Sequence, residues 1–246
     1  MNKNCIILHI PHSSLVVPEE ALHQYDADFL QEEFLLMTDR YTDELFCLPY
    51  ASIIFPYSRL FCDVERFRDD SQEEMSQKGM GVVYTKTHEG IEYRKVTSEE
   101  KEKILITYYD SHHQKLEKLV DENLKEYGEA FIIDCHSFNP YPLPHENDKT
   151  QRPDVCIGFD EFHADKELVL FLKDCFESKG YSVKIDSPFQ GSIVPLKYYG
   201  RNKKVRSVMI ELNRKLYMNK LGERTGNFQK LKADISEIIL RLRRSK

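Results

Sequence analysis

Short apolar runs alternate with longer amphipathic stretches along the chain, and this alternation limits the possible folds more than any other feature. The apolar runs are residues 5–10, 51–57, 131–135, 154–159, 181–186 and 206–212. The amphipathic stretches are residues 28–48, 98–128, 164–180 and 227–244, and their periodicity predicts helices. Strands that alternate with helices indicate an α/β fold, and continuous apolar strands fit a sheet covered by helices on both faces.

Local signals set the expected ends of these helices. Ser98 is a plausible N-cap for the helix that follows it, while Gly128 and Gly180 are typical stop residues. The stretches 64–97 and 138–153 lack periodicity, and long irregular segments inside a compact domain are often binding loops. Because no linker-like stretch divides the chain, we predict a single domain over residues 1–246.

Composition excludes several classes of protein. The net charge of −6 argues against a nucleic-acid partner, which would require a basic face. No apolar run approaches the roughly 18 residues of a membrane span, and the first run is too short for a signal peptide, so we expect a cytoplasmic protein with no membrane partner. The six cysteines include no C-x-x-C pair, and we expect them to be reduced and mostly buried.

Polar side chains follow the predicted strands at the points where the strands end. His12 follows the first apolar run, His136 follows the third, and Glu211 lies at the end of the last. Ligands bind beyond the carboxyl ends of the strands in open α/β sheets, so we expect these side chains to meet at one edge. Two neutral imidazoles and a carboxylate, with one position open to water, form a catalytic zinc arrangement.

The third metal ligand is expected from the segment MTDRYTDELF. Asp39 and Asp43 are four residues apart there and would share one face of a helix, so both remain candidates. Glu211 is the natural general base for a metal-activated water. Asp134 points to the same side of its strand as His136, where it would orient the imidazole or reach the site itself. A nucleophilic Cys135–His136 pair is disfavoured, because adjacent strand residues point to opposite faces.

A series of motifs resembles the N-formylglutamate amidohydrolase family, in the same order and over nearly the whole chain. The motifs are IPHSSLVVP (10–18), TDRYTDELF (38–46), YSRLFCDVERF (57–67), Gly79-x-Gly81, YYDSHHQKL (108–116), IIDCHSF (132–138), PDVCIGF (153–159), SPFQGSIVPLKYYG (187–200) and MIELNRKLYM (209–218). The set in this order is fairly specific. The resemblance implies a three-layer fold like that of the zinc carboxypeptidases and aspartoacylase, with a mixed, mostly parallel sheet between helices.

The resemblance also implies a reaction. It points to hydrolysis of the amide that joins a small acyl group to an acidic amino acid, and most directly to conversion of N-formyl-L-glutamate into formate and L-glutamate. That reaction is the last step of one route of histidine degradation. The implied cofactor is Zn²⁺ or another divalent metal ion, and the implied partner is the small acidic substrate.

Site residues follow from the resemblance position by position. His12 and His136 match the metal-type histidines, Asp39 is the favoured third ligand with Asp43 as the alternative, and Glu211 matches the general base. The candidate substrate-binding residues are Arg59, Arg66, Arg214, His113 and Gly191. A planar guanidinium suits two-point capture of a substrate carboxylate, and the loop around Gly191 would close over the ligand.

The chain departs from the family pattern next to one of these arginines. Where the family has Asn-Arg, this chain has Glu65-Arg66, and an acid at this place is expected to alter or weaken recognition of a substrate carboxylate. Two alternative functions therefore stay open. One is a zinc carboxypeptidase or a deacylase for another N-acyl amino acid or peptide, and the other is a non-catalytic relative that binds an acidic metabolite.

Overall fold

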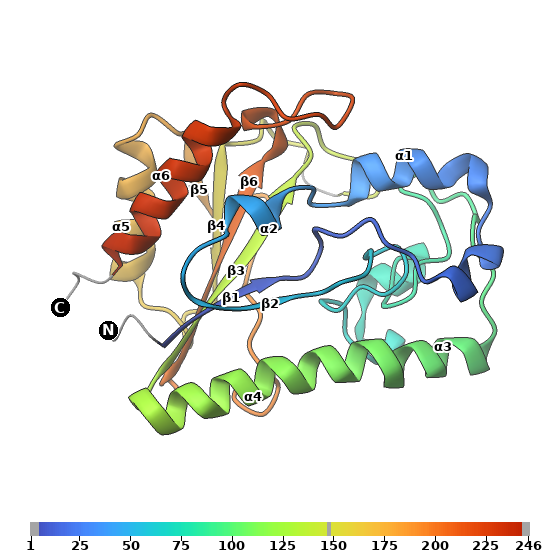
Figure 1. Cartoon of the computed structure of the whole chain (residues 1–246), viewed down its shortest axis with the longest axis horizontal. Coiled ribbons are helices and arrows are strands. Elements are labelled where there is room, and N and C mark those ends of the chain that lie inside the picture. Colours follow the sequence, from blue (N-terminus) through green and yellow to red (C-terminus); the bar gives the residue numbers. More distant parts are fainter. Residues whose placement is uncertain (1–4, 147–148, 243–246) are drawn as a thin grey trace.

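A six-stranded sheet forms the centre of the computed structural model, which describes residues 5–146 and 149–242 (Figure 1). The strands are β1 (Ile6–Ile10), β2 (Ala51–Ile54), β3 (Ala130–Phe138), β4 (Val155–Phe159), β5 (Val183–Ile185) and β6 (Val205–Asn213). Their spatial order is β2-β1-β3-β6-β4-β5, and only the β4–β6 pair is antiparallel. The predicted α/β fold with a mixed, mostly parallel sheet is confirmed.

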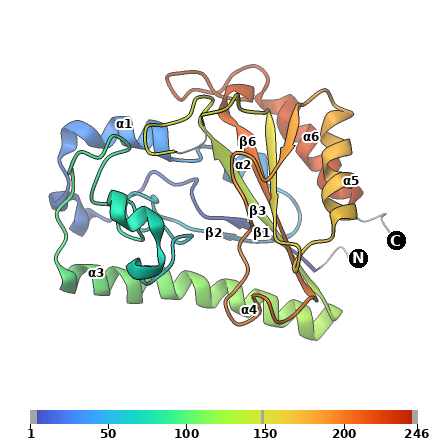
Figure 2. The same ribbon diagram turned by 180° about the vertical axis from the view of Figure 1, so that it is seen from behind.

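Helices cover both faces of the sheet (Figures 1 and 2). The α-helices are α1 (Ala27–Met37), α2 (Thr42–Leu45), α3 (Ser98–Ile104), α4 (Asp110–Tyr127), α5 (Lys166–Glu177) and α6 (Phe228–Arg241). Residues of α2, α5 and α6 share one apolar core with the sheet, and residues of α4 share another core with its opposite face. The helix α1 lies beside the sheet and packs with irregular segments in a separate cluster.

Alternation along the strands decides which side chains enter which core. On β3, Ile133 and Cys135 pack on the side of α2, α5 and α6, whereas Ile132 packs on the α4 side. Asp134 and His136 therefore face the α4 side, where Asp134 contacts His9 and His9 contacts His112 of α4. Cys135 lies in the opposite core, so the geometry does not support its pairing with His136 as a nucleophile.

The amphipathic stretch 28–48 forms two helices and not one. The helix α1 ends at Met37, and α2 begins at Thr42 after Tyr41, whose φ of 70° is left-handed. The N–H of Asp39 in this break donates to the carbonyl of His12 at 2.9 Å, outside any helix. The expectation that Asp39 and Asp43 share one helix face is therefore wrong, because only Asp43 lies in α2.

The stretch 98–128 also differs from prediction at its start and in its middle. Thr97 is the N-cap and forms a capping box with Glu100, so the assignment to Ser98 is wrong by one residue. A π-helical turn at Leu105–Tyr109 separates α3 from α4. Gly128 ends α4 with a φ of 75°, as predicted.

Strand ends differ from the apolar runs for local reasons. The strand β2 stops at Ile54, and Pro56 shortly after it has no N–H for the ladder. By contrast, β3 is longer than its apolar run, because it pairs with β6 over nine positions that include its polar end. The predicted run 181–186 yields only the short edge strand β5.

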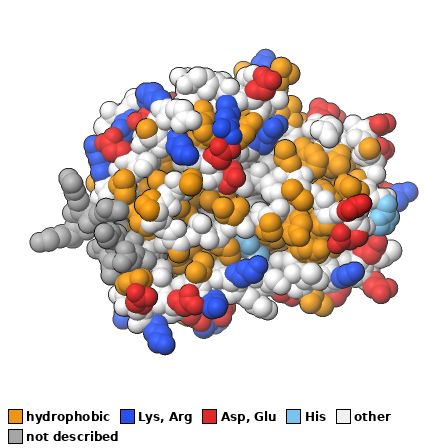
Figure 3. Space-filling view, viewed as in Figure 1, with side chains coloured by type: hydrophobic (Ala, Val, Ile, Leu, Met, Phe, Trp, Pro, Cys, Tyr) orange, Lys and Arg blue, Asp and Glu red, His pale blue; other side chains and the backbone are white. Residues whose placement is uncertain are grey.

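Irregular segments lie between β2 and α3 and between β3 and β4. Within residues 64–97, the regular secondary structure consists of two 3₁₀ turns, Asp70–Gln72 and Glu74–Lys78. The remaining 3₁₀ turns are Glu19–Gln24 and Arg214–Leu216. No helix in the described ranges is long and apolar enough to cross a membrane. Acidic, basic and hydrophobic side chains are interspersed on the face drawn in Figure 3.

Candidate active site

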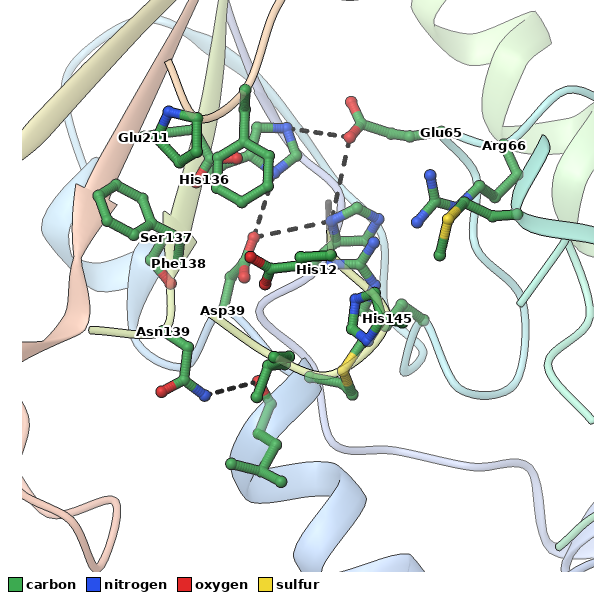
Figure 4. Close-up of a pocket in the computed structure, with 18 of the residues that line it drawn as sticks. His12, Asp39, Glu65, Arg66, His136, Ser137, Phe138, Asn139, His145 and Glu211 are labelled. Atoms are coloured by element: carbon green, nitrogen blue, oxygen red, sulfur yellow. Dashed lines mark hydrogen bonds and ion pairs between the residues drawn. The ribbon is translucent and has the colours of Figure 1, made fainter. Parts of the chain in front are cut away.

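The carboxyl ends of β1, β3 and β6 meet at one edge of the sheet. His12 follows β1 by two residues, while His136 and Glu211 are direct partners in the parallel β3–β6 register. Figure 4 shows the two imidazoles facing each other across a pocket, and their ring centroids are 5.2 Å apart. The structure thus brings together the three residues that the strand-end argument selected.

Asp39 joins these two histidines. Its Oδ2 lies 3.1 Å from His136 Nδ1 and 3.6 Å from His12 Nδ1. Its Oδ1 accepts a hydrogen bond from Arg214 Nη2 at 2.8 Å. Burial alone would raise the pKa of Asp39, but its contacts with the two imidazoles and the charge of Arg214 hold that pKa well below its usual range.

Asp43 lies apart from this group. Within the described residues it makes no hydrogen bond or ion pair with either histidine, and burial together with neighbouring Glu44 raises its pKa. Arg214 is buried and donates to Asp39 and to the hydroxyl and carbonyl oxygens of Ser137. Its guanidinium therefore holds Asp39 in place.

Asp63 orients His12 from the outer side of the site. Its Oδ1 lies 2.8 Å from His12 Nε2, and its Oδ2 accepts from Arg59 Nη2 and from the Tyr84 hydroxyl at 2.8 Å each. Burial opposes ionisation, yet the charge of Arg59 dominates and holds the pKa of Asp63 well below its usual value. With a proton on Nε2, His12 Nδ1 faces the pocket, where it is buried without a hydrogen-bond partner.

Glu65 enters the same pocket, although sequence reasoning gave it only an indirect role. Its Oε2 lies 3.0 Å from His136 Nε2 and 4.0 Å from His12 Nδ1 (Figure 4). Ligand atoms of Glu65, His12 and His136 all lie within 4.8 Å of one another, a spacing compatible with a metal ion. The available signal was the acid at a position where the family pattern has asparagine.

Asp134 contacts His136 as the strand alternation predicted. Its Oδ1 lies 3.0 Å from His136 Nε2 and 2.8 Å from His9 Nδ1. Burial would lower the pKa of His136, but the carboxylates of Glu65 and Asp134 outweigh burial and raise that pKa well above its usual value. The pocket therefore favours positive charge between its acids.

Glu211 has the environment expected of a proton-transfer group. Burial raises its pKa to about 7, partly opposed by the positive charge of His136. Its Oε2 is buried without a hydrogen-bond partner. A carboxyl group that titrates near neutral pH beside two imidazoles can accept and return a proton at the pH where enzymes operate.

These residues line a cavity of about 820 Å³. Arg59 and Arg66 both line it, and Arg66 Nε is buried without a hydrogen-bond partner. His113 lies outside this cavity, where its Nε2 is 2.7 Å from the carbonyl of Val64. Gly191 also lies outside the lining, although Gln190 beside it is part of the wall.

Arg152 is a further buried cation near the cavity that sequence reasoning missed. Its guanidinium carbon lies 5.4 Å from the ring of Phe138 and 5.2 Å from the ring of Phe189, and the group forms an ion pair with Glu146. Burial lowers its pKa, and the negative charge of Glu211 partly opposes this. Because Arg152 precedes β4, its position depends on the antiparallel direction of that strand.

A mixed α/β sheet whose strand ends deliver histidines and acids to one pocket places the chain among the open α/β proteins that bind a ligand beyond the carboxyl ends of their strands. The family profile of N-formylglutamate amidohydrolase matches residues 4–218, and the chain belongs to this family of amidohydrolases.

Two solved structures are similar to the chain in fold. One is N-formylglutamate amidohydrolase from Ralstonia eutropha JMP134, with a TM-score of 0.77, 22% identity, and coverage of 97% of this chain and 92% of that chain. The other is a gene product of Agrobacterium tumefaciens, with a TM-score of 0.69, 18% identity, and coverage of 97% and 89%. No curated protein matches the chain.

The residues present fit a divalent metal ion. His12 Nδ1 is buried and has no hydrogen-bond partner. The carboxylates of Asp39, Glu65 and Asp134 all approach the His136 imidazole, and those of Asp39 and Glu65 also approach His12. Carboxylates gathered in a buried site need compensating positive charge close by, as protonated imidazoles or as a metal ion. Imidazole nitrogens and carboxylate oxygens are the ligand types of catalytic zinc sites.

Proposed function

We propose that the chain is a metal-dependent amidohydrolase that cleaves the amide of an N-acyl acidic amino acid, with N-formyl-L-glutamate as its substrate. The observation that carries the proposal is the convergence of His12, Asp39 and His136 beside the buried, unpartnered oxygen of Glu211. Membership of the N-formylglutamate amidohydrolase family supports the reaction class.

In this proposal, His12, Asp39 and His136 hold the metal, Zn²⁺ being the first choice. The bound ion supplies a Lewis acid and lowers the pKa of water towards neutrality. Asp63 keeps the proton of His12 on Nε2, so that Nδ1 stays available as a ligand. Arg214 holds the outer oxygen of Asp39 and leaves Oδ2 facing the histidines.

Glu211 acts as the general base and then as the general acid. It accepts a proton from the attacking water and returns one to the nitrogen of the leaving amino acid. Its pKa of about 7, raised by burial, suits both directions of transfer near neutral pH. When the substrate displaces water from the cavity, the positive charges that line the cavity attract the negative oxygen that develops on the substrate more strongly.

Arg59 and Arg66 are the proposed anchors for substrate carboxylates. The guanidinium of Arg59 is largely engaged by Asp63, so its contribution is the positive field at the cavity wall. Arg66 has weaker contacts, an ion pair with Asp63 at 3.5 Å and a hydrogen bond to the Tyr84 hydroxyl at 3.4 Å, and can reorient towards a carboxylate. A bidentate contact with Arg would fix the substrate's orientation.

The first experiment measures formate and glutamate release from N-formyl-L-glutamate. Protein purified without chelator is assayed, stripped of metal, and assayed again after return of Zn²⁺. Release that disappears on stripping and returns with metal is expected. Protein that holds stoichiometric zinc but releases no glutamate would refute this substrate, and other N-acyl amino acids and peptides would then be assayed with the same preparation.

The role of Glu211 has its own test. Glu211→Gln should lower turnover by about 10²- to 10⁴-fold, as expected for a lost acid–base group, while the metal content stays unchanged. Glu167→Gln, which neutralises an exposed acid on α5, is the matched control and should leave turnover unchanged. A near-normal rate in the Glu211 variant would show that another group moves the proton.

A further inference from the structure

Glu65 lies between two groups of ligand-type side chains. Its Oε2 faces the first group, at 3.0 Å from His136 Nε2 and 4.0 Å from His12 Nδ1. Its Oε1 faces the second group, at 3.6 Å from His9 Nδ1, and His9 is in turn 2.8 Å from Asp134 Oδ1. Ligand atoms of His9, Glu65 and Asp134 all lie within 4.8 Å of one another.

The charge balance of this second group is unusual. Every ion pair of Glu65 and of Asp134 in the described residues is with a histidine, and none is with lysine or arginine. Asp134 is buried, and the side chain of Glu65 is only 20% exposed. Two carboxylates in this position need positive charge close by, either as protons on the imidazoles or as metal ions.

We propose that His9, Asp134 and Glu65 form a second metal position and that Glu65 bridges it to the first. The separation of 3.6 Å between His9 Nδ1 and Glu65 Oε1 is close to the ~3.3 Å expected between two ligands of a tetrahedral zinc ion. The separation of 2.8 Å between His9 and Asp134 suits a shared proton, which an entering ion displaces. Oε1 of Glu65 then serves the second ion, while its Oε2 reaches the first ion beside His12 Nδ1, the nitrogen that Asp39 Oδ2 also faces.

The surroundings of His9 favour this use of Nδ1. His9 Nε2 lies 2.9 Å from His112 Nε2, a contact that holds a single proton. With that proton on His9, its Nδ1 presents a lone pair to Asp134 and Glu65. Asp134 is held in place by the N–H of Ile193, which donates to Oδ2 at 3.0 Å. Its Oδ1 faces the proposed ion position between His9 Nδ1 at 2.8 Å and His136 Nε2 at 3.0 Å.

A separate cavity adjoins two of the three residues of the second position. This cavity of about 390 Å³ is lined by Glu65 and Asp134 and lies against Tyr109 and His113. His9 is buried and does not line this cavity, so the cavity borders the second position through its two carboxylates. The inference rests on the proposed function through Glu65, because the bridge requires an ion at the first position as well.

The test counts metal ions. The purified chain is dialysed against increasing Zn²⁺, and bound zinc is measured by elemental analysis in wild type and in the Glu65→Asn and His9→Gln variants. We expect two ions per chain in wild type and one in each variant. Asp110→Asn is the matched control, because it removes a carboxylate that pairs with Arg68 outside both positions, and it should retain two.

Counting ions does not show whether Glu65 bridges them, but magnetic coupling between two bridged ions can be detected by spectroscopy. Mn²⁺-loaded wild type should give the electron paramagnetic resonance spectrum of a coupled pair, and Glu65→Asn should give that of an isolated ion. One zinc at saturation in wild type would overturn the second position and leave the first, whereas no bound zinc would overturn both. Two uncoupled ions, or two ions retained in a variant, would also overturn the proposal. Thermal unfolding verifies that Glu65→Asn, whose side chain is partly exposed, remains folded.

Discussion

Asp63→Asn should weaken metal binding although Asp63 is not itself a proposed metal ligand, because its carboxylate contacts the ligand His12. Donors approach both oxygens of Asp63: His12 Nε2 at 2.8 Å and the N–H of Glu65 at 3.1 Å face Oδ1, while Arg59 and the Tyr84 hydroxyl face Oδ2. An asparagine amide has one accepting and one donating end, so its NH₂ group must meet a donor on one side.

The size of the effect on metal affinity and on stability depends on which neighbour the NH₂ group of the new asparagine faces. If it faces His12, the imidazole proton moves to Nδ1 and blocks the proposed ligand position. If it faces Arg59, a buried guanidinium loses its partner, which destabilises a fold by about 3–5 kcal/mol. Loss of a carboxylate that orients a ligating histidine lowers metal affinity by about 10- to 100-fold. That range corresponds to about 1.4–2.7 kcal/mol.

Competition with a chromophoric chelator measures the zinc affinity of wild type and Asp63→Asn, and urea unfolding measures the stability of both. Asp69→Asn is a suitable control, because Asp69 is exposed and caps only a short 3₁₀ turn. We expect Asp69→Asn to bind zinc as wild type does. Equal affinity in wild type and Asp63→Asn, with the variant folded, would refute the role of Asp63 in setting the His12 tautomer.

Three further changes test other parts of the structure. Arg66→Gln should raise KM by about 10- to 100-fold with a smaller effect on kcat, because it removes one charge-assisted contact to the substrate; an unchanged KM would remove Arg66 from the anchors. Burial lowers the pKa of His112 in the folded chain to about 2. Below about pH 6.5 the unfolded chain therefore binds one proton more than the folded chain, and the free energy of unfolding decreases as the pH is lowered, by up to ~1.4 kcal/mol per pH unit. His112→Gln should reduce that slope in urea unfolding between pH 7.5 and 5, and an identical slope would contradict the assignment. A Cβ at Gly158 would lie 2.4 Å from the Gly191 carbonyl oxygen, so Gly158→Ala should destabilise the fold by about 1–3 kcal/mol in urea unfolding, whereas the exposed Gly226→Ala should not.

The sheet was predictable from sequence because its strands are continuous apolar runs with polar ends. That pattern is local, and it led to His12, His136 and Glu211 before any contact between them was known. The ends of β3 and β6 could not be placed from the apolar runs alone, since the ladder between these strands continues into residues such as His136 and Asn213.

Asp39 and Glu65 show where local reasoning fails. The helix break that places Asp39 depends on a main-chain bond to His12, which is distant in sequence and invisible to periodicity. Glu65 lies in a segment without a repeating pattern, and its approach to His136 depends on how that segment packs against the sheet. In both cases the decisive contact is tertiary, so sequence supplied the candidate residue but not its partners.

Because β4 runs opposite to its neighbour β6, the segment between β3 and β4 returns along the edge of the sheet where the pocket lies. The pocket is therefore built from strand ends and from a connecting segment, and the sequence of the segment can vary without a change in the strands. His12, His136 and Glu211 arrive at the ends of outgoing strands, whereas Arg152 arrives just before an incoming one, through the segment that leaves β3. The part of the cavity wall within residues 139–146 can therefore gain or lose residues while the strands that carry His12, His136 and Glu211 keep their register. Under the proposed function, an engineer seeking a new acyl or amino acid preference would begin with the lining residues within 139–146, and would leave the sheet untouched.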